Sequence, residues 1–426
     1  LEDAVRHEQA KSGQAIVMNI DTGEILALAV RPTFNLNTFH EAPPAHRRNR
    51  AVADTFEPGS TFKVFLAAAI IELNKIDQSE KIFCHNGLMR YNGANIHDVA
   101  PHKFLNFEDI ISLSSNIGVV KLSEKLTKKD FYRILQDFGF GSVTNVDLPG
   151  ERNGLLPAPE KWSVLTKANL AFGQGVSVSP IQLISAFSAA VNGGNYYWPH
   201  ITAKISNQMG ETVLEFQPRI QRRVIREQTS EKVVKILRKA VTVGTAKAAY
   251  IPDVDVIGKT GTAQKADPAG GYSKDRYVMS FVGAMMAVKP RLAIMVMIDE
   301  PRIFKDRTGG KVAAPDFKKM AEGILALCGS QPNNHSNPIM ASKGEWSRPA
   351  SAPEQAISVQ PGPNPGEWTV PDFKGLNMRQ VLDVMNTMKC DVSMNGFGKV
   401  ISQKPKPGTI VNEGASISVS FGGGNL

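Results

Sequence analysis

The sequence predicts an α+β fold in which an antiparallel sheet is flanked by helices and joined to an all-helical lobe. The strand signals come from both ends of one domain, residues 13–30 and 254–299, and the segment between them has mostly helical periodicity. Residues 329–367 are rich in Pro, Ser, Asn and Gly, which predicts a flexible linker. We therefore expect one domain over residues 1–328 and a second, small α+β module over residues 368–426.

The first two strands are predicted to form a hairpin. Apolar runs at 13–20 and 24–30 are joined by Asp21-Thr22-Gly23, a pattern typical of two well-buried strands. Residues 31–56 contain prolines and a polar run, so we expect irregular structure there. The apolar run at 64–71 has no polar face, which is typical of a helix buried on all sides.

The other elements follow from apolar periodicity and turn residues. The predicted helices are 107–113, 117–126, 130–138, 181–191, 230–243 and 317–327, and the predicted strands are 201–205, 213–216, 254–264, 277–288 and 291–299. In the small module, a helix at 377–389 precedes a strand with Ile417, Val419 and Phe421 on one face. This module has no catalytic constellation, so we expect a binding or spacing role.

Composition argues against several classes of function. The chain has 426 residues, 42% hydrophobic and 21% charged, and no apolar run approaches the ~20 residues that span a bilayer. The net charge of +9 is spread along the chain without aromatic-interleaved basic stretches, so no nucleic-acid partner is expected. The three cysteines are far apart, and the spacing of Cys84, His85, His97 and His102 matches no usual zinc motif. Neither a disulfide framework nor a metal site is expected.

Ser60 and Lys63 form the first candidate motif. Pro58-Gly59 ends a loop and Ser60 is predicted to begin the buried helix, which would place its hydroxyl beside the Lys63 amine at the positive end of the helix dipole. A serine becomes a nucleophile when a neighbour takes its proton, and a lysine does so when burial or nearby positive charge keeps it neutral. The structural alternative is a capping serine and a solvated lysine.

The second motif is Ser114-x-Asn116. It places a hydroxyl and a carboxamide between two predicted helices, where both side chains can face a cleft. Ser and Asn are also common in loops and N-caps, and Ser393-x-Asn395 repeats the pattern in the small module. The motif alone is therefore weak.

The third motif, Lys259-Thr260-Gly261-Thr262, falls on a predicted strand. Gly261 would weaken that strand unless a peptide substrate approaches its backbone at an exposed edge. Lys259 would supply a fixed positive charge, and the hydroxyls of Thr260 and Thr262 can hold a carboxylate.

In this order the three motifs resemble the signatures of penicillin-binding proteins and serine β-lactamases. The flanking stretches Glu57-Pro58-Gly59, Phe172-Gly173-Gln174-Gly175 and Val243-Gly244-Thr245-Ala246 are similar to those of the class B, monofunctional transpeptidases, and residues 114–119 resemble the cell-division branch. Residues 10–327 carry this resemblance, and residues 370–421 resemble one PASTA module. The chain opens like mid-helix without an initiator Met, so we expect the family's membrane anchor and pedestal upstream.

The resemblance implies a serine D,D-transpeptidase that cross-links peptidoglycan stem peptides in septal cell-wall synthesis and is trapped by β-lactams. Ser60 would attack the penultimate carbonyl of D-Ala-D-Ala with Lys63 as base. Ser114 would relay the proton, Asn116 would orient Lys63 and the substrate amide, and Lys259 would add positive charge. The Ser60 and Thr262 N–H groups would form the oxyanion hole, and Thr260, Gly261 and Thr262 would bind substrate. No cofactor is implied.

The implied partners are stem peptides, β-lactams and cell-division proteins that include a lipid II glycosyltransferase. The implied location is the extracytoplasmic face of the bacterial cytoplasmic membrane. An elongation-type transpeptidase, a β-lactam-binding sensor and a β-lactamase remain as alternatives. A lactamase would need a base that hydrolyses the acyl-enzyme, and Glu160 is the candidate, although a glutamate between prolines and Trp162 is more typical of a solvated loop.

Overall fold

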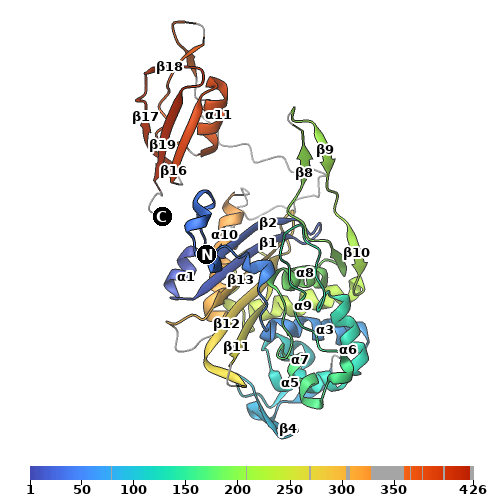
Figure 1. Cartoon of the computed structure of the whole chain (residues 1–426). Coiled ribbons are helices and arrows are strands. Elements are labelled where there is room, and N and C mark those ends of the chain that lie inside the picture. Colours follow the sequence, from blue (N-terminus) through green and yellow to red (C-terminus); the bar gives the residue numbers. More distant parts are fainter. Residues whose placement is uncertain are drawn as a thin grey trace. The chain divides into compact units, whose positions relative to one another are not determined.

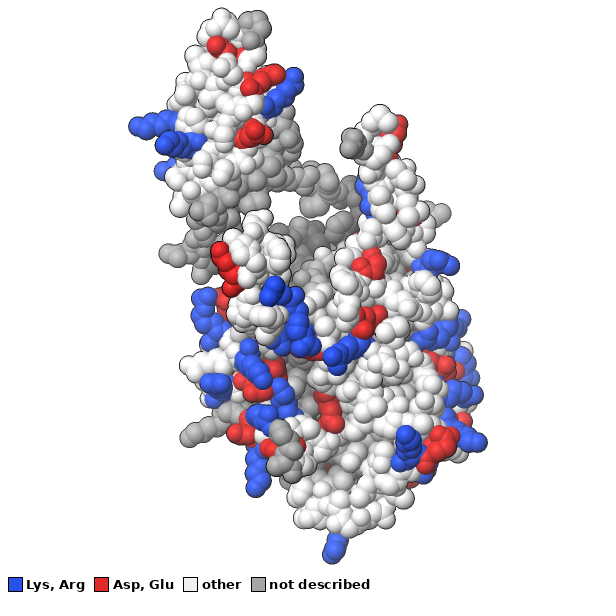
Figure 2. Space-filling view, viewed as in Figure 1, with Lys and Arg blue, Asp and Glu red and all other residues white. Residues whose placement is uncertain are grey.

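The computed structural model describes residues 1–77, 79–207, 209–267, 270–303, 308–327, 359–364, 366–376, 378–396 and 399–422. The chain divides into two compact units, Leu1–Ser336 and Asn337–Leu426 (Figure 1). Lys and Arg side chains are interspersed with Asp and Glu over the face of the molecule in Figure 2. This distribution agrees with the diffuse charge expected from the sequence.

A five-stranded antiparallel sheet forms the centre of the first unit. Its order is β11-β12-β13-β1-β2, and β1 pairs with both β2 and β13, so strands from the two ends of the unit meet in one sheet. The predicted α+β sheet and its first hairpin are thereby confirmed. The strands are β1 (Ser12–Asn19), β2 (Ile25–Arg31), β11 (Val256–Ala266), β12 (Tyr272–Met285) and β13 (Leu292–Asp299).

Side chains alternate across this sheet and feed two separate cores. On β13, Leu292 and Ile294 pack with α1 (Glu2–His7) and α10 (Gly309–Leu327). The intervening Ala293 and Met295 pack with the helices of the opposite side. The sheet is therefore covered on both faces, as the ribbon in Figure 1 also shows.

The central helix α3 (Lys63–Glu72) is buried from Lys63 to Ile71, which confirms the prediction of a helix buried on all sides. Its apolar side chains pack against the surrounding helices and against the sheet in one large core. The surrounding helices are α4 (Phe107–Ser112), α5 (Asn116–Glu124), α6 (Lys128–Asp137), α7 (Val164–Ala171), α8 (Pro180–Val191) and α9 (Glu227–Thr242).

Several predictions for the first unit were wrong or incomplete. The lobe is not all-helical, because β3 (Lys81–Phe83) pairs with β6 (Phe104–Asn106) and β4 (Leu88–Tyr91) pairs with β5 (Ala94–His97). Strands of three or four residues are too short to show a period of two. Helix α7 was not predicted, α1 agrees with the helical pattern expected at the start of the chain, and residues 31–56 are not wholly irregular. They contain α2 (Arg50–Ala53) and the 3-10 turns Leu36–Glu41 and Pro44–His46.

Other elements have shifted boundaries. The strand predicted at 201–205 is β8 (Lys204–Ser206), paired with β9 (Thr212–Glu215), and β7 (Asn195–Tyr197) pairs with β10 (Ile220–Arg223). The last helix, α10, begins eight residues before the predicted 317 and continues through Pro315. A proline inside a helix normally argues against it, so this start could not be read from the sequence.

The second unit is a small α+β module. One three-stranded sheet has the order β14 (Gln360–Pro361), β15 (Glu367–Thr369) and β18 (Ile410–Asn412). The other has the order β16 (Asp391–Gly396), β19 (Ser416–Gly422) and β17 (Lys399–Lys404). The helix of this module is α11 (Met378–Met388). The linker predicted at 329–367 extends too far, because β14 and β15 belong to this module. Residues 329–358 lie outside the described part of the chain. Across the described residues, none of the helices has the length and apolar character needed to cross a membrane.

Candidate active site

Ser60 lies in a 3-10 turn rather than at the start of the α-helix. The turn, Gly59–Phe62, leads directly into α3 at Lys63. Gly59 has a φ of 56°, and a Cβ there would lie 2.8 Å from the Thr262 carbonyl oxygen. Only glycine permits this close approach without strain. The turn therefore places Ser60, which is half-buried, beside the edge strand β11.

Lys63 is fully buried, and its amine binds the second motif. Nζ donates to Ser114 O at 2.6 Å, Asn116 Oδ1 at 2.7 Å and Ser114 Oγ at 3.2 Å. The sequence predicted Ser60 as the neighbour, but among the described residues no hydrogen bond joins Lys63 to Ser60. Lys63 instead connects α3 to the loop before α5.

Ser114 joins all three motifs. It lies between α4 and α5 with a φ of 63°, an unusual value for a residue other than glycine. Lys259 Nζ donates to the Ser114 Oγ at 2.9 Å and also to the Thr260 carbonyl oxygen at 3.3 Å. The Ser114 hydroxyl is thus shared by two lysine amines that lie 0% exposed.

Burial controls the charge of these two lysines. It lowers the pKa of Lys259 to about 7. Burial also lowers the pKa of Lys63 well below its ordinary value, and the nearby charge of Lys259 lowers it further, whereas Asp98 opposes this shift. The two shifts act in the same direction, so they disfavour the state in which both amines are charged.

Asp98 is a site residue that sequence reasoning missed. Its carboxylate accepts hydrogen bonds from Ser115 Oγ at 2.6 Å, Asn116 N at 2.5 Å and Ile117 N at 3.0 Å. It therefore holds the N-terminus of α5, where N–H groups lack helical partners. The adjacent His97 carbonyl accepts from Asn116 Nδ2 at 2.8 Å. No local pattern around 98 signals this role, because the contacts cross from β5 to a helix.

The hydroxyls of the third motif already have partners. Thr260 Oγ1 lies 3.1 Å from Thr245 Oγ1, and Thr262 Oγ1 accepts from Gly309 N at 3.0 Å. Gly261 is required for packing rather than for substrate access alone, because a Cβ there would lie 2.2 Å from Ser280 Oγ and 2.9 Å from Thr61 Cγ2. Thr245 belongs to the predicted Val243-Gly244-Thr245-Ala246 stretch, whose position beside β11 the sequence alone did not give.

The sequence model of the penicillin binding protein transpeptidase domain matches residues 13–322. The chain belongs to this family of penicillin-binding proteins. The PASTA domain model matches residues 369–423, so the second unit is a C-terminal PASTA domain.

Relatives of this penicillin-binding protein are class B members. The chain is 33% identical to stage V sporulation protein D of Bacillus subtilis over 95% of its own length and 60% of that protein. It is 32% identical to peptidoglycan D,D-transpeptidase FtsI of Escherichia coli over 78% of its own length and 54% of that protein. The chain thus spans less than two thirds of these relatives.

Solved structures of the family share the fold. Penicillin-binding protein 3 of Mycobacterium tuberculosis, in complex with aztreonam, superposes with a TM-score of 0.69 at 33% identity and covers 76% of this chain and 74% of its own. The transpeptidase domain of Burkholderia pseudomallei penicillin-binding protein 3 gives a TM-score of 0.68 at 30% identity, over 79% and 94% of the two chains. The predicted fold class and family are confirmed.

Glu160, the candidate for a hydrolytic base, lies in the 3-10 turn Pro159–Lys161 and is exposed. Its carboxylate makes no hydrogen bond or ion pair with a residue that the structure describes. A base that activates water needs fixed contact with the reacting groups. The position of Glu160 therefore gives no support to a lactamase reading of this penicillin-binding protein.

Proposed function

We propose that this penicillin-binding protein is a peptidoglycan D,D-transpeptidase that forms an acyl-enzyme on Ser60. The observation that carries the proposal is the Ser114 hydroxyl, which lies 3.2 Å from Lys63 Nζ and 2.9 Å from Lys259 Nζ. Burial lowers the pKa of both amines, which favours a neutral Lys63 that can act as the base in acyl transfer. The names of the relatives support the same reaction.

In the first step, Ser60 Oγ attacks the penultimate carbonyl of a D-Ala-D-Ala stem peptide and its proton passes to neutral Lys63. The bond between this carbonyl carbon and the terminal D-Ala nitrogen breaks, and Ser114 relays the proton from Lys63 to that leaving amine. The Ser60 hydroxyl and Lys63 approach each other when substrate binds, because catalytic hydrogen bonds tighten in the Michaelis complex. The amine of a second stem peptide then takes the acyl group and frees Ser60.

The positive end of the site orients the substrate. We expect the N–H groups of Ser60 and Thr262 to receive the developing oxyanion, and the close approach of Gly59 to Thr262 supports this expectation. Asn116, fixed by the His97 carbonyl, orients Lys63 and the substrate amide. Thr260, Gly261 and Thr262 present the edge of the sheet to the peptide, and Lys259 attracts its terminal carboxylate.

The proposal also covers the cellular role, the location and the partners of the protein. We infer a septal role at the extracytoplasmic face of the cytoplasmic membrane, alongside cell-division proteins that include a lipid II glycosyltransferase, with FtsI as the relative that supports it. β-Lactams would acylate the same serine. The catalytic domain would end near residue 328 and the PASTA domain would begin at 359, where β14 starts one residue later.

The test combines penicillin trapping with turnover. Intact-mass spectrometry after benzylpenicillin treatment should show one penicilloyl adduct, and peptide mapping should locate it on Ser60. A D-Ala-D-Ala stem pentapeptide with an amine acceptor should then release D-Ala and yield cross-linked dimer. An adduct on another serine, or hydrolysed penicillin released at many turnovers per minute, would contradict a transpeptidase.

A further inference from the structure

The stretch Val243-Gly244-Thr245-Ala246 has no role in the reaction proposed above, although Thr245 contacts two of the motif-bearing segments. The stretch follows α9 directly and belongs to no helix or strand. Thr245 N donates to the carbonyl of Ser112, two residues before Ser114, at 3.2 Å. Its hydroxyl oxygen lies 3.1 Å from that of Thr260, the residue after Lys259. Thr245 therefore connects the segment of the second motif to the strand of the third.

Two glycines allow this close packing around Thr245. A Cβ at Gly244 would lie 2.3 Å from Ser112 O, and a Cβ at Gly310, the second residue of α10, would lie 2.6 Å from Thr245 O. A larger residue at either position would displace Thr245. The end of α4, the strand β11 and the start of α10 thus hold Thr245 from three sides.

The amine of Lys259 is buried and lies near three oxygen atoms. Its Nζ is 2.9 Å from Ser114 Oγ, 3.3 Å from Thr260 O and 3.5 Å from Thr260 Oγ1. A charged ammonium has three N–H donors and no acceptor, so these oxygens account for all of its donors. None of the three belongs to a carboxylate.

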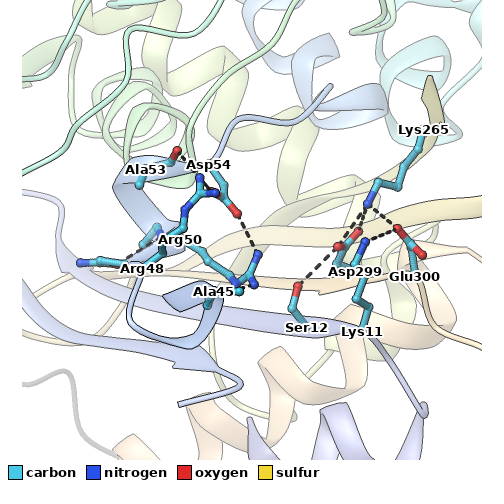
Figure 3. A network of polar contacts seen from close by, with 12 residues as sticks. Lys11, Ser12, Ala45, Arg48, Arg50, Ala53, Asp54, Lys265, Asp299 and Glu300 are labelled. Carbon is cyan, nitrogen blue, oxygen red and sulfur yellow. Dashed lines mark hydrogen bonds and ion pairs between the residues drawn. The ribbon is translucent and has the colours of Figure 1, made fainter. Parts of the chain in front are cut away.

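Lys265, on the same strand, has the more usual partners of a lysine (Figure 3). Its amine binds Asp299 at 2.9 Å and Glu300 at 2.6 Å. Burial lowers the pKa of Lys265, but the two carboxylates outweigh this effect and the pKa is raised overall. At Lys259 burial is not offset in this way, and its pKa falls to about 7. The charge of Lys259 therefore depends on how well neutral oxygens accept its hydrogen bonds.

The Thr260 hydroxyl has two hydrogen-bonding neighbours in the described part of the chain, Lys259 Nζ and Thr245 Oγ1. A charged Lys259 cannot accept a hydrogen bond, so the Thr260 oxygen accepts from Lys259 and the Thr260 proton goes to Thr245 Oγ1. Thr245 is exposed, so its own proton is free to bind water. The hydrogen bonds thus run in one direction, from Lys259 through Thr260 to Thr245.

Removal of the Thr245 hydroxyl would reverse the orientation of Thr260. The Thr260 proton would then turn to its other neighbour, the Lys259 amine, which accepts a hydrogen bond only in its neutral form. A hydrogen bond to the neutral form of a titratable group disfavours the charged form. The pKa of Lys259 would therefore fall further.

We propose that Thr245 is a positioning residue for Lys259, because it accepts the Thr260 hydroxyl proton and so keeps the Thr260 oxygen turned toward the charged amine. Thr245 acts through Thr260, and its contact with Ser112 holds the segment before Ser114 against the same strand. The importance of this arrangement for acyl transfer rests on the proposed function, in which Lys259 adds positive charge. The hydrogen-bond chain itself does not depend on that function.

Other charged groups around Lys259 do not take the place of this chain. Lys63, at the start of α3, shares the Ser114 hydroxyl and carries the same sign of charge. The opposite residue on β12 is Val282, and the turn Gly59–Phe62 has no charged residue. The charged groups on the flanking helices have other neighbours: Lys239 pairs with Asp109, Arg238 pairs with Asp255, and Asp316 lies near Lys319, His7 and Glu8.

An NMR titration of the lysine side chains tests the proposal without requiring activity. The whole chain is labelled with [13C]lysine, and the Lys259 Cε signal is identified by its absence in Lys259→Arg. We expect a midpoint at about pH 7 in the parent protein and a midpoint about one pH unit lower in Thr245→Val. Thr245→Ser, which keeps the hydroxyl, should restore the parent midpoint. An unchanged midpoint in Thr245→Val overturns the proposal.

Two further comparisons separate this role from a structural one. Thr242→Val is the matched control, because the Thr242 hydroxyl donates to Arg238 O of its own helix at 3.2 Å, and it should leave the midpoint unchanged. Thr260→Val should lower the midpoint, and Thr245→Val added to it should cause no further change. Additive shifts would mean that Thr245 does not act through Thr260 and would contradict the proposal. Thr245→Ala, a second variant without the hydroxyl, should reproduce the midpoint of Thr245→Val.

The pH dependence of penicillin acylation separates this inference from the proposed function. If the charge of Lys259 serves acyl transfer, the decline of the rate at high pH should begin about one pH unit lower in Thr245→Val and return to the parent position in Thr245→Ser. A parent protein that forms no penicilloyl adduct on Ser60 contradicts the proposed function, while the NMR midpoints still decide the role of Thr245. A normal adduct with an unmoved midpoint in Thr245→Val overturns the role of Thr245 alone.

Discussion

The two compact units differ in what they bury. The transpeptidase unit encloses Lys63 and Lys259 completely, within a core that is otherwise largely apolar. In the described part of the PASTA unit, every buried residue is apolar, with Phe373, Ile417 and Val419 at its centre. An isolated buried charge is costly, and a fold retains one where its chemistry needs a shifted pKa. This contrast supports the proposal that acyl transfer takes place in the first unit.

The largest effect is expected at the nucleophile. Ser60→Ala should abolish labelling by a fluorescent penicillin while leaving the melting temperature close to that of the parent protein, because Ser60 is half-buried and its hydroxyl has no partner among the described residues. The matched control is Ser393→Ala, which removes the serine of the S-x-N repeat in the PASTA unit and should leave labelling unchanged. Labelling that persists in Ser60→Ala would falsify the assignment of the nucleophile.

The second largest effect is expected at Lys63, the proposed base. Lys63→Arg should slow penicillin acylation by about 10² to 10⁴-fold, the usual contribution of a general base, because a guanidinium does not deprotonate. Stopped-flow acylation rates measure the effect. A rate near that of the parent protein would mean that Lys63 acts as a fixed charge, and the difference between the two units would then lie in packing rather than in chemistry.

The charge on the second lysine predicts a pH dependence. Burial lowers the pKa of Lys259 to about 7, so its positive charge is present below that pH and is lost as the pH rises through it. Acylation should therefore decline above about pH 7, by up to ten-fold per pH unit if the charge is essential. The Lys259→Arg variant keeps a positive charge at this position over the whole pH range, so its acylation rate should not show this decline. The same falling limb in both proteins would exclude Lys259 as its cause.

A smaller effect is expected at Asp98. Asp98→Asn removes a negative charge that opposes the lowering of the Lys63 pKa, so the Lys63 pKa should fall further and the rising limb of acylation should move to lower pH. Loss of a carboxylate that holds the α5 N-terminus should also slow acylation and lower the free energy of unfolding by about 1 kcal/mol, the usual cost of a lost helix cap. Asp130→Asn, at the exposed start of α6, serves as a control. A slowed rate without any shift in pH profile would reduce Asp98 to a structural role.

The sequence indicated the fold and the chemistry where local patterns carry them. The nearly continuous burial of β1 and β13 and the uniformly apolar α3 follow directly from their apolar runs. The spacing of Ser60 and Lys63 predicted a pair, yet the structure joins Lys63 to Ser114 instead. A 3-10 turn in place of a helical start changes the direction of a side chain, and sequence spacing does not reveal that change.

Contacts between segments that lie far apart in the chain could not be predicted from the sequence. Asp98, which follows β5, contacts the start of α5, and Thr245, which follows α9, contacts Thr260 on β11. Gly261 is small because Ser280 and Thr61 pack against it, and neither residue is near it in sequence. These contacts form only when distant segments pack together in the folded protein. Asp and Gly are common residues, so their presence in the sequence does not predict such contacts.

The smallest effect is expected from removing the PASTA unit. All hydrogen bonds of Lys63, Ser114 and Lys259 go to residues between 63 and 260, and the PASTA core closes on its own side chains, from Val370 to Val419. The two charged groups that change the pKa of Lys63, Lys259 and Asp98, also belong to the first unit. Truncation after Leu327 should leave the acylation rate within a few-fold of the full chain and its pH profile unchanged. The isolated PASTA unit, expressed from residue 359, should in turn melt cooperatively without binding penicillin. Circular dichroism would show whether the truncated first unit is still folded. A large loss of acylation in a folded truncated protein would mean that the PASTA unit contributes to the chemistry, and would contradict the assignment of catalysis to the first unit alone.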